Sequence, residues 1–475
     1  MAPDSAVGTR PSNARQSLYY LLGAALQGTG ALVVQPFSIR LLSPLEWGRV
    51  GVSIVLLQIG QVVLSAGLPL AISRAYFEQS EGPSKARAIH GANIMLGTGL
   101  AAIAALGYLA AAPDKEGAGA FAWALAATGF LSVVVSSQAL LRSQHRALSF
   151  VLLSGGASLG AHLGGLVGIL AFGRTAAVYL ASFTAVMVAT AVVSLILTRP
   201  SLPWRQRPAV AAAFRLGLPV LPHSIAIVLL LQGDTFLVQN FQGASSVGRY
   251  VAAAAFALGP FAILAGLNNV WTTRIFEAAH GPNLVANVRA VGREVALLAA
   301  ALGVCGTAAA TIGMLILKGP DHEATQLAKV LPGVAVGYAL YLVGMSTLFA
   351  VGRTKALAWA TPLVVVVAAG LAWFPAQSSQ YWELGAVRVL VFALLGALYA
   401  VLALREAPHS IALRSFMGAL ALVAVAIAVN LLLPTTLLVG TITLVVGLAL
   451  AGTAFLAVRR RGLASSATDP ASPTP

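Results

Sequence analysis

The sequence predicts an all-α membrane protein, a polytopic bundle of about fourteen transmembrane helices, and three observations support this prediction. Of the 475 residues, 58% are hydrophobic and 9% are charged, whereas soluble domains carry about a quarter charged residues. The apolar residues come in blocks of about twenty, the length that crosses a hydrocarbon core of about 30 Å as a helix. The blocks also lack the alternation of polar and apolar residues that marks the strands of a transmembrane barrel.

Basic residues outnumber acidic residues, and the net charge is +15. The basic residues lie in short loops between the apolar blocks, which is the pattern that holds loops on the cytoplasmic side of a membrane. This distribution excludes a nucleic-acid-binding stripe. The single cysteine, Cys305, lies in an apolar block and excludes an internal disulfide and a cysteine-based metal site. We expect no cofactor and no metal.

An even number of spans puts both termini on one side of the membrane. With the N-terminus inside, the tails and even-numbered loops hold 21 Lys and Arg and the odd-numbered loops hold 8, so both termini are predicted to be cytoplasmic. Residues 1–16 lack a signal-peptide pattern, and the polar tail 459–475 is predicted to be disordered. The predicted spans are 17–39, 50–72, 89–112, 119–141, 149–172, 176–198, 217–240, 247–272, 294–317, 327–351, 357–375, 384–404, 412–433 and 437–458.

The sequence contains an internal repeat with an offset of 200 residues. "LSPLEWGRV" around the second span matches "QGASSVGRY" around the eighth, and "SRAYFE" with Arg74 matches "TRIFE" with Arg274. Because six spans per half is an even number, the halves share one orientation and should be related by a pseudo-twofold axis along the membrane normal. The predicted organisation is a first lobe at 17–200, a second lobe at 201–405 and two further spans at 406–458.

These motifs resemble those of a known family. "PFSIRLLSPLEWGRV" and "SAGLPLAISRAYFE" resemble the start of Wzx-type oligosaccharide flippases, and "FRLGLPVLPHSIAIVLLLQGDTFLVQNFQGASSVGRY" resembles the start of their second half. Such flippases belong to the multidrug/oligosaccharidyl-lipid/polysaccharide exporter superfamily. The resemblance implies movement of an undecaprenyl-pyrophosphate-linked oligosaccharide across a bacterial inner membrane. It implies a cavity lined by the first, second, seventh and eighth spans, and polysaccharide polymerase and export machinery as candidate partners.

Other functions remain open at this point. A cation-coupled multidrug exporter of the same superfamily usually has twelve spans, whereas a lipid II flippase has fourteen. A membrane-bound polymerase or ligase usually carries a large extracytoplasmic loop, and every loop here is short. The sequence contains no P-loop, no H-E-x-x-H and no paired-carboxylate motif, so we predict a transporter and no enzyme.

Asp234 is the first candidate site residue. It is the only acidic residue well inside a predicted span, where a carboxylate costs about 2.5–3.5 kcal/mol and usually faces a cavity or a partner. Arg40 ends the first span on the same side of the membrane, so we hypothesise that the two border the outer half of the cavity and pair there. The alternatives are a hydrated Asp234 and an Arg40 that extends to the interface. His223 lies about three turns from Asp234 on nearly the same face.

Arg74 and Arg274 are candidates for binding pyrophosphate, because a guanidinium matches phosphate oxygens. They end repeat-related spans on the predicted cytoplasmic side. The alternative is that they only set the topology.

Polar side chains form further candidate stripes. Gln58, Gln61 and Ser65 share one helix face, as do Thr128, Ser132 and Ser136, and each stripe predicts either a hydrated cavity wall or hydrogen bonds between helices. His162 is a packing residue or a site residue. The glycines spaced by four in the fifth span predict a close helix-packing face, and prolines predict bends; these residues are Gly156, Gly160, Gly164 and Gly168, and Pro69, Pro219, Pro222 and Pro260.

Overall fold

The computed structural model describes residues 19, 22–23, 26, 33–112, 115–257, 259–278, 283–316, 322–353, 355–378 and 380–467, and these ranges contain helices and no strand. In this part of the chain, ten helices are long and apolar enough to cross a membrane, or eleven if one bent pair is counted. Two shorter apolar helices, Leu357–Trp373 and Leu437–Thr453, accompany them. The helical membrane bundle is confirmed. The count of fourteen stays a prediction, since the first predicted span lies largely outside the described residues.

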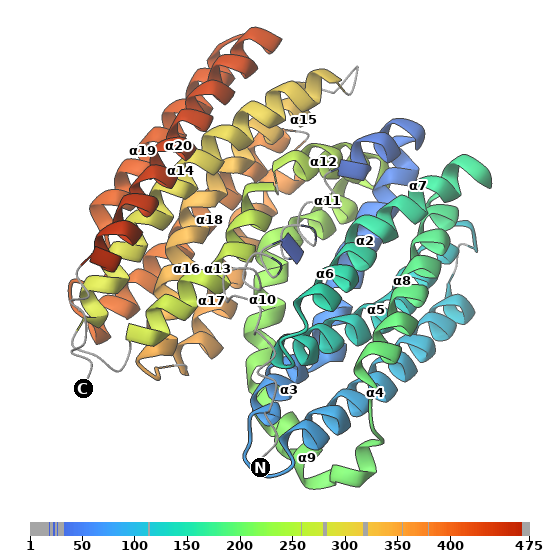
Figure 1. The fold of residues 1–475 in the computed structure, drawn as a ribbon. Helices are drawn as coiled ribbons and strands as arrows, with labels where there is room; N and C mark the ends of the chain where they lie inside the picture. Colours follow the sequence, from blue (N-terminus) through green and yellow to red (C-terminus); the bar gives the residue numbers. More distant parts are fainter. Residues whose placement is uncertain are drawn as a thin grey trace, which may run out of the picture.

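The first lobe packs around a cluster that includes Trp47, Tyr179, Phe183 and Met187. In the ribbon view its helices form a group beside the second lobe, and the two groups meet where α2 (Pro44–Ser65) packs against α12 (Ala244–Ala257) (Figure 1). The described segment 33–41 is helical and precedes the longer helices. The lobe contains α2 (Pro44–Ser65), α3 (Leu68–Tyr76), α4 (Gly82–Ala111), α5 (Lys115–Ser143), α6 (Ala147–Gly155), α7 (Ala161–Ala171) and α8 (Ala176–Thr198).

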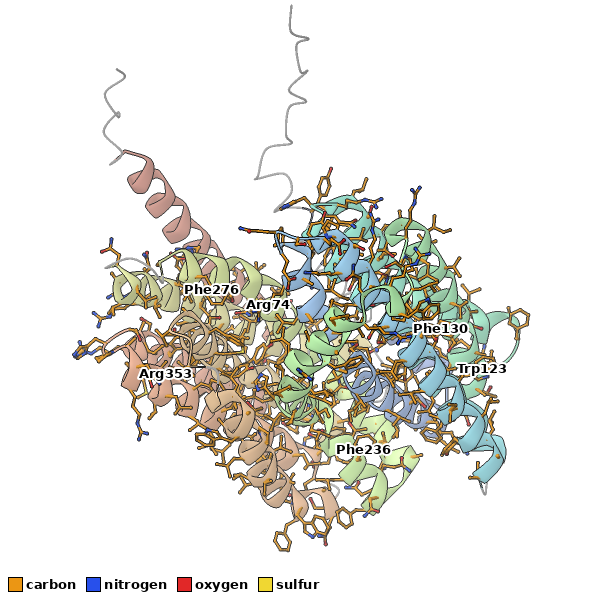
Figure 2. The ribbon with its side chains drawn as sticks, turned by 90° about the horizontal axis from the view of Figure 1, so that it is seen from below. Arg74, Trp123, Phe130, Phe236, Phe276 and Arg353 are labelled. Carbon is orange, nitrogen blue, oxygen red and sulfur yellow. The ribbon has the colours of Figure 1, made fainter. Side chains whose placement is uncertain are left out.

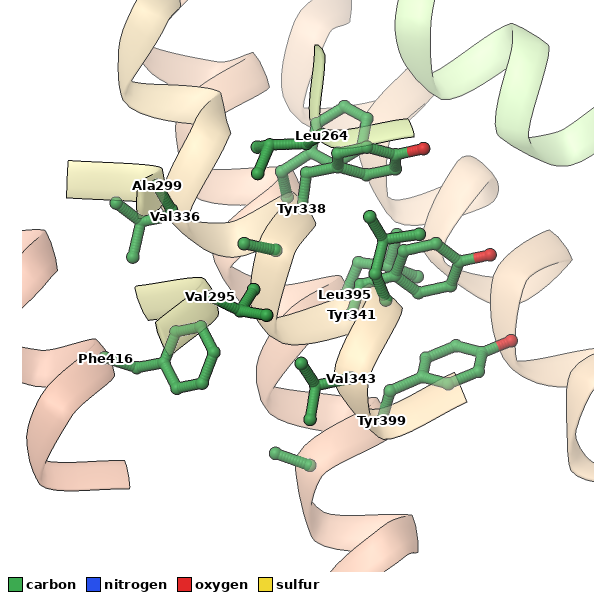
Figure 3. Close-up of a cluster of buried hydrophobic side chains, with 14 of the residues drawn as sticks. Leu264, Val295, Ala299, Val336, Tyr338, Tyr341, Val343, Leu395, Tyr399 and Phe416 are labelled. Carbon is green, nitrogen blue, oxygen red and sulfur yellow. The ribbon is translucent and has the colours of Figure 1, made fainter. Parts of the chain in front are cut away.

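The second lobe packs around an aromatic-rich cluster (Figure 3). The hydroxyls of Tyr338, Tyr341 and Tyr399 lie on one side of this cluster. The lobe contains α10 (Leu221–Gln232), α11 (Asp234–Gln242), α12 (Ala244–Ala257), α13 (Gly259–Glu277), α14 (Leu284–Ile316), α15 (His322–Val330), α16 (Val334–Ala350), α17 (Lys355–Trp373) and α18 (Tyr381–Glu406).

Two further helices, α19 (Leu413–Leu432) and α20 (Leu437–Ala467), pack against α14 at the edge of the second lobe (Figure 1). Lys329 joins the pair to the lobe, because its ammonium donates to the carbonyl of Asn430 at 2.6 Å and to Thr435 at 2.9 Å. The tail that we predicted to be disordered from residue 459 is helical to residue 467. Arg and Ala favour helix, so the helix continues past the apolar segment.

The seventh predicted span, 217–240, is interrupted, and a helix that precedes it packs against the first lobe. α9 (Arg207–Gly217) follows a short 3₁₀ turn at Pro203–Gln206, and a second 3₁₀ turn at Leu218–Val220 separates it from α10. Proline lacks a backbone N–H and interrupts helical hydrogen bonding, which accounts for breaks near Pro219 and Pro222. Ala213 of α9 packs with Leu68 and Ile72 of α3, although our boundary had placed this segment in the second lobe.

The fifth span confirms the predicted packing face and adds an unexpected feature. A Cβ on Gly156, Gly164 or Gly168 would overlap side chains of α8, so these glycines allow the two helices to approach closely. Residues Gly156–Gly160 form one turn of π-helix between α6 and α7. Such π-turns are rare and often occur at functional sites, and this one adjoins the cavity described next.

Candidate functional site

A cavity of about 550 Å³ lies between the two lobes, which is a typical volume for a ligand pocket. Helices α2, α5, α7 and α8 of the first lobe contribute to its wall, as do α10, α11, α12, α13 and α18 of the second. Both halves of the repeat therefore face the same space.

The polar lining of the cavity is uncharged or basic. Among the lining residues that the structure describes, none is an aspartate or a glutamate. Amide and hydroxyl groups suit sugar hydroxyls, and guanidinium groups suit phosphate oxygens. The polar lining residues are Gln35, Gln58, Gln61, Arg142, Ser158, His162, Gln232, Thr235 and Arg388.

On the predicted outer side, the two lobes touch at the two glycines of the repeated Gly-Arg motif. A Cβ on Gly48 would overlap the carbonyl of Ala244, and a Cβ on Gly248 would overlap the carbonyl of Pro44. The two contacts are related by the repeat, because Gly48 and Gly248, and Pro44 and Ala244, are each 200 residues apart. A local twofold axis requires this reciprocity. Only glycine permits this approach of two backbones.

The predicted cytoplasmic end of the cavity carries basic and aromatic side chains. Arg142, near the end of α5, lies 5.6 Å from the ring centre of Phe150, and both line the cavity. Arg74, at the end of α3, is exposed, and seen from below it lies near the boundary between the lobes (Figure 2). No described residue forms an ion pair with Arg74.

Asp234 lies inside the second lobe and pairs with Arg388 of α18. Both side chains are buried, with 11% and 5% of their surfaces exposed. Arg388 Nε donates to Asp234 Oδ2 at 2.9 Å, and its Nη2 also contacts both carboxylate oxygens. The hydroxyl of Tyr250 donates to Asp234 at 2.5 Å and accepts from Arg388 at 2.8 Å.

The hypothesis that Asp234 pairs with Arg40 is therefore wrong. Arg40 is exposed, and the carboxylate of Asp234 is occupied by Arg388 and Tyr250. A buried carboxylate takes the partner that can reach it with the best geometry, and a guanidinium on a packed neighbouring helix does so.

His223 belongs to a separate network in the second lobe. Its Nδ1 lies 2.9 Å from the hydroxyl of Thr361, which in turn lies 2.7 Å from the hydroxyl of Tyr399. Its Nε2 lies 3.3 Å from the hydroxyl of Tyr341. His223 and Asp234 both face the lobe interior, and neither is among the described residues of the cavity wall.

The first polar stripe faces both the cavity and the lobe interior. Gln58 and Gln61 line the cavity, and Gln58 accepts a hydrogen bond from Gln232 across the lobe interface at 2.7 Å. Gln61 donates to Ser65 at 2.8 Å, and Ser65 lies 3.1 Å from Ser132. Ser65 therefore joins a lining side chain to the interior of the first lobe.

The second stripe is internal, because Thr128, Ser132 and Ser136 are all buried. Asn93 donates to Ser132 and to Ser136 at 3.1 and 3.0 Å, and His90 lies 2.9 Å from Ser136. For this stripe, hydrogen bonding between helices is the correct interpretation. His162 lines the cavity and lies 2.8 Å from the hydroxyl of Tyr179.

The repeat-related arginines differ in their surroundings. Arg274 pairs with the buried Glu294 of α14 at 2.6 Å. Arg74 is exposed, as described above. Arg74 is absent from the described cavity wall, and its role stays a prediction, whereas Arg274 holds α13 and α14 of its own lobe together.

Several polar lining residues were missed in the sequence, among them Arg388, Arg142 and Gln232. Arg388 lies inside the predicted span 384–404 and carries the same signal as Asp234, an ionisable group at membrane depth. Arg142 was assigned to a loop, and Gln232 had no periodic partner. Their place in the cavity depends on packing between helices far apart in the sequence.

Comparison with known proteins agrees with this architecture. A sequence model of a family described as "polysaccharide biosynthesis protein" matches residues 39–276, and no curated protein matches. A MOP superfamily transporter from Pyrococcus furiosus, reported to have a binding pocket of reverse polarity, has a TM-score of 0.59 at 16% identity, over 86% of this chain and 95% of that one.

Two further solved structures show multidrug resistance MATE family transporters of the MOP superfamily. The outward-facing one has a TM-score of 0.60 at 15% identity, over 86% of this chain and 95% of that one. The inward-facing one has a TM-score of 0.59 at 16% identity, over 88% and 96%. The similarity therefore identifies the fold and does not select a conformational state.

The chain is a multi-pass helical membrane protein with a cavity between two lobes, and it shares the fold of transporters of the MOP superfamily. The chain belongs to the polysaccharide biosynthesis protein family, whose model covers half of its length.

Proposed function

We propose that this protein is a flippase that moves an undecaprenyl-pyrophosphate-linked oligosaccharide from the cytoplasmic to the outer leaflet of a bacterial inner membrane. The observation that carries this proposal is the charge of the cavity lining. Arg142 contributes a cationic group and Arg388, whose charge is balanced by Asp234, contributes N–H donors, and no carboxylate lies among the described lining residues. Such a lining favours an anionic substrate and disfavours the cations that many multidrug exporters carry.

The uncharged part of the lining supports the same substrate. Gln58, Gln61 and Gln232 offer amide donors and acceptors, which match the hydroxyl groups of an oligosaccharide. A substrate with a phosphate end and a sugar end would use both kinds of lining. The family of polysaccharide biosynthesis proteins agrees with a glycan cargo.

Loading from the cytoplasmic leaflet follows from the two ends of the cavity. The lobes touch at Gly48 and Gly248 on the predicted outer side, and Arg142 of the cavity lining and Arg74 at the end of α3 lie on the predicted cytoplasmic side. A pyrophosphate headgroup would meet these arginines before it reaches the amides. Alternating access then requires the glycine contact to open while the cytoplasmic side closes.

Deletion of the gene in its native host tests this proposal. We expect undecaprenyl-linked repeat units to accumulate on the inner leaflet and surface polysaccharide to disappear, with both effects reversed by the intact gene. The control is a strain that lacks a polysaccharide polymerase, in which single repeat units reach the outer leaflet. Repeat units on the outer leaflet of the deletion strain would indicate a polymerase or ligase, and unchanged surface polysaccharide would contradict the proposal.

A further inference from the structure

We propose that Arg388 recognises an anionic oxygen of the substrate, and that Asp234 and Tyr250 are positioning residues that aim its guanidinium into the cavity. The inference rests on the proposed function, because the anionic oxygen is taken to be that of the pyrophosphate. It assigns to the ion pair a role in substrate specificity, in addition to joining helices α11, α12 and α18.

The guanidinium of Arg388 is held on one side only. Its Nε and Nη2 atoms bond Asp234, and Nη2 also donates to Tyr250. The ring of Tyr250 lies 5.8 Å from the guanidinium carbon. A planar guanidinium fixed by its Nε edge and by an aromatic ring loses little further freedom when it binds a ligand.

The opposite corner of the same group faces the substrate space. Arg388 lines the 550 Å³ cavity, and none of the described residues accepts a hydrogen bond from its Nη1 atom. Nη1 is also not one of the fully buried polar atoms without a partner in the described part of the chain, so it is accessible. A donor that is reachable from the cavity and unsatisfied by the protein is suited to an oxygen of the cargo.

The charge of Asp234 decides how Arg388 acts. The pair is close to neutral at a distance, so it adds little to the long-range attraction of an anion. At contact distance a directional N–H donor still discriminates an anionic oxygen from a cation. Arg74 and Arg142 would therefore attract the anionic substrate from a distance, and Arg388 would recognise its oxygen at contact distance.

A charge swap separates recognition from a purely structural pair. The double variant Asp234→Arg/Arg388→Asp keeps opposite charges on the same two helices, but it presents a carboxylate to the cavity. In proteoliposomes, we expect a folded protein whose transport of a polyprenyl-pyrophosphate-linked oligosaccharide falls about ten- to a hundredfold, the factor that a hydrogen bond to a charged group contributes. Transport near the wild-type rate would overturn the proposal.

A second variant covers the case in which the swapped protein does not fold. Asp234→Asn/Arg388→Gln replaces the ion pair by two amides that can bond one another, and it should lose apparent affinity for the same lipid by a similar factor while the maximal rate changes less. An unchanged apparent affinity would overturn the proposal. Tyr250→Phe should weaken the affinity less, since only one of the bonds that orient Arg388 is lost.

Lys329→Met is the matched control. Lys329 is a buried cation of the same lobe, but it bonds Asn430 and Thr435 and is absent from the described cavity wall. We expect this variant to lose stability and to keep its apparent affinity for the lipid. If the wild-type protein moves no pyrophosphate-linked lipid at all, the proposed function fails; if it does and the swapped variant equals it, only the role of Arg388 fails.

Discussion

The two lobes descend from one repeated pattern of spans but stabilise their interiors by different chemistry. The first lobe buries uncharged polar groups, and a hydrogen-bonded series through Ser65, Ser132, Asn93 and His90 crosses it. The second lobe buries charge, as shown by Asp234 with Arg388, Glu294 with Arg274, and Lys329 against backbone and hydroxyl oxygens.

Under the proposed function, this difference would give the lobes different parts of the cargo to bind. The network of the first lobe reaches the cavity at Gln61, an amide that suits a sugar hydroxyl. The ion pair of the second lobe reaches the same cavity at Arg388, a group that suits a phosphate oxygen. A substrate with two chemically distinct ends can therefore lie across the lobe interface.

The largest expected effect on transport comes from the reciprocal contact of Gly48 and Gly248, to which the two lobes contribute equivalent residues. In Gly248→Leu, the new side chain would overlap the backbone carbonyl of Pro44. Backbone atoms cannot move aside as a flexible side chain can, so the two lobes would have to repack. We therefore expect transport to fall below about a tenth of the wild-type rate. Transport in proteoliposomes measures this. Gly99→Leu is the matched control, because a Cβ there meets nothing within 4 Å. Equal loss in both variants would show that the glycine contact has no special role.

The next effect is on the second lobe alone. Asp234→Asn leaves the buried guanidinium of Arg388 without its counter-ion, which costs about 3–5 kcal/mol of stability. We expect a clear drop in the midpoint of thermal unfolding in detergent. His90→Gln in the first lobe removes no charge and should lower the midpoint less. The reverse order would contradict the contrast between the lobes.

The repeat-related arginines should separate function from stability. Arg274→Gln removes the ion pair between Arg274 and the buried Glu294 and should lower the thermal midpoint. Arg74→Gln should leave the midpoint unchanged and reduce transport several-fold, because the substrate loses a cation at the mouth. Measuring both quantities on both variants tests this, and equal behaviour of the two would remove the proposed role of Arg74.

The smallest expected effect lies in the uncharged network. Asn93→Leu removes hydrogen bonds to Ser132 and Ser136, and bonds of this kind between membrane helices contribute about 0.6–2 kcal/mol each. We expect a modest fall in the thermal midpoint with transport largely kept. A loss of transport at unchanged stability would mean that this network acts in the transport cycle and not only in packing.

The sequence predicted the fold well because spans depend on local composition. Blocks of apolar residues gave the helices, and the Gly-Arg repeat pointed to the pair Gly48 and Gly248, which the structure brings into contact. Breaks inside spans were less visible. The break at Ala66 and Gly67, where both residues have positive φ, lies in a continuous apolar block.

The site was harder to predict because it depends on which helices pack together. Gln58 and Gln61 were found, since their helical spacing places them on one face. The partner of Asp234 was not found, because Arg388 is 154 residues away and no local pattern links the two. Arg40 was chosen by its depth along the membrane normal, and depth alone does not show which helices are neighbours.

The central claim is that the cavity carries an anionic glycolipid, and a direct measurement is transport by the purified protein in proteoliposomes. Two substrates are offered separately, a fluorescent polyprenyl-pyrophosphate-linked oligosaccharide and a lipophilic cationic dye. We predict that the glycolipid crosses the bilayer at a rate well above that of empty liposomes and that the dye is not moved. Movement of the dye without movement of the glycolipid would contradict the account and identify a multidrug exporter instead.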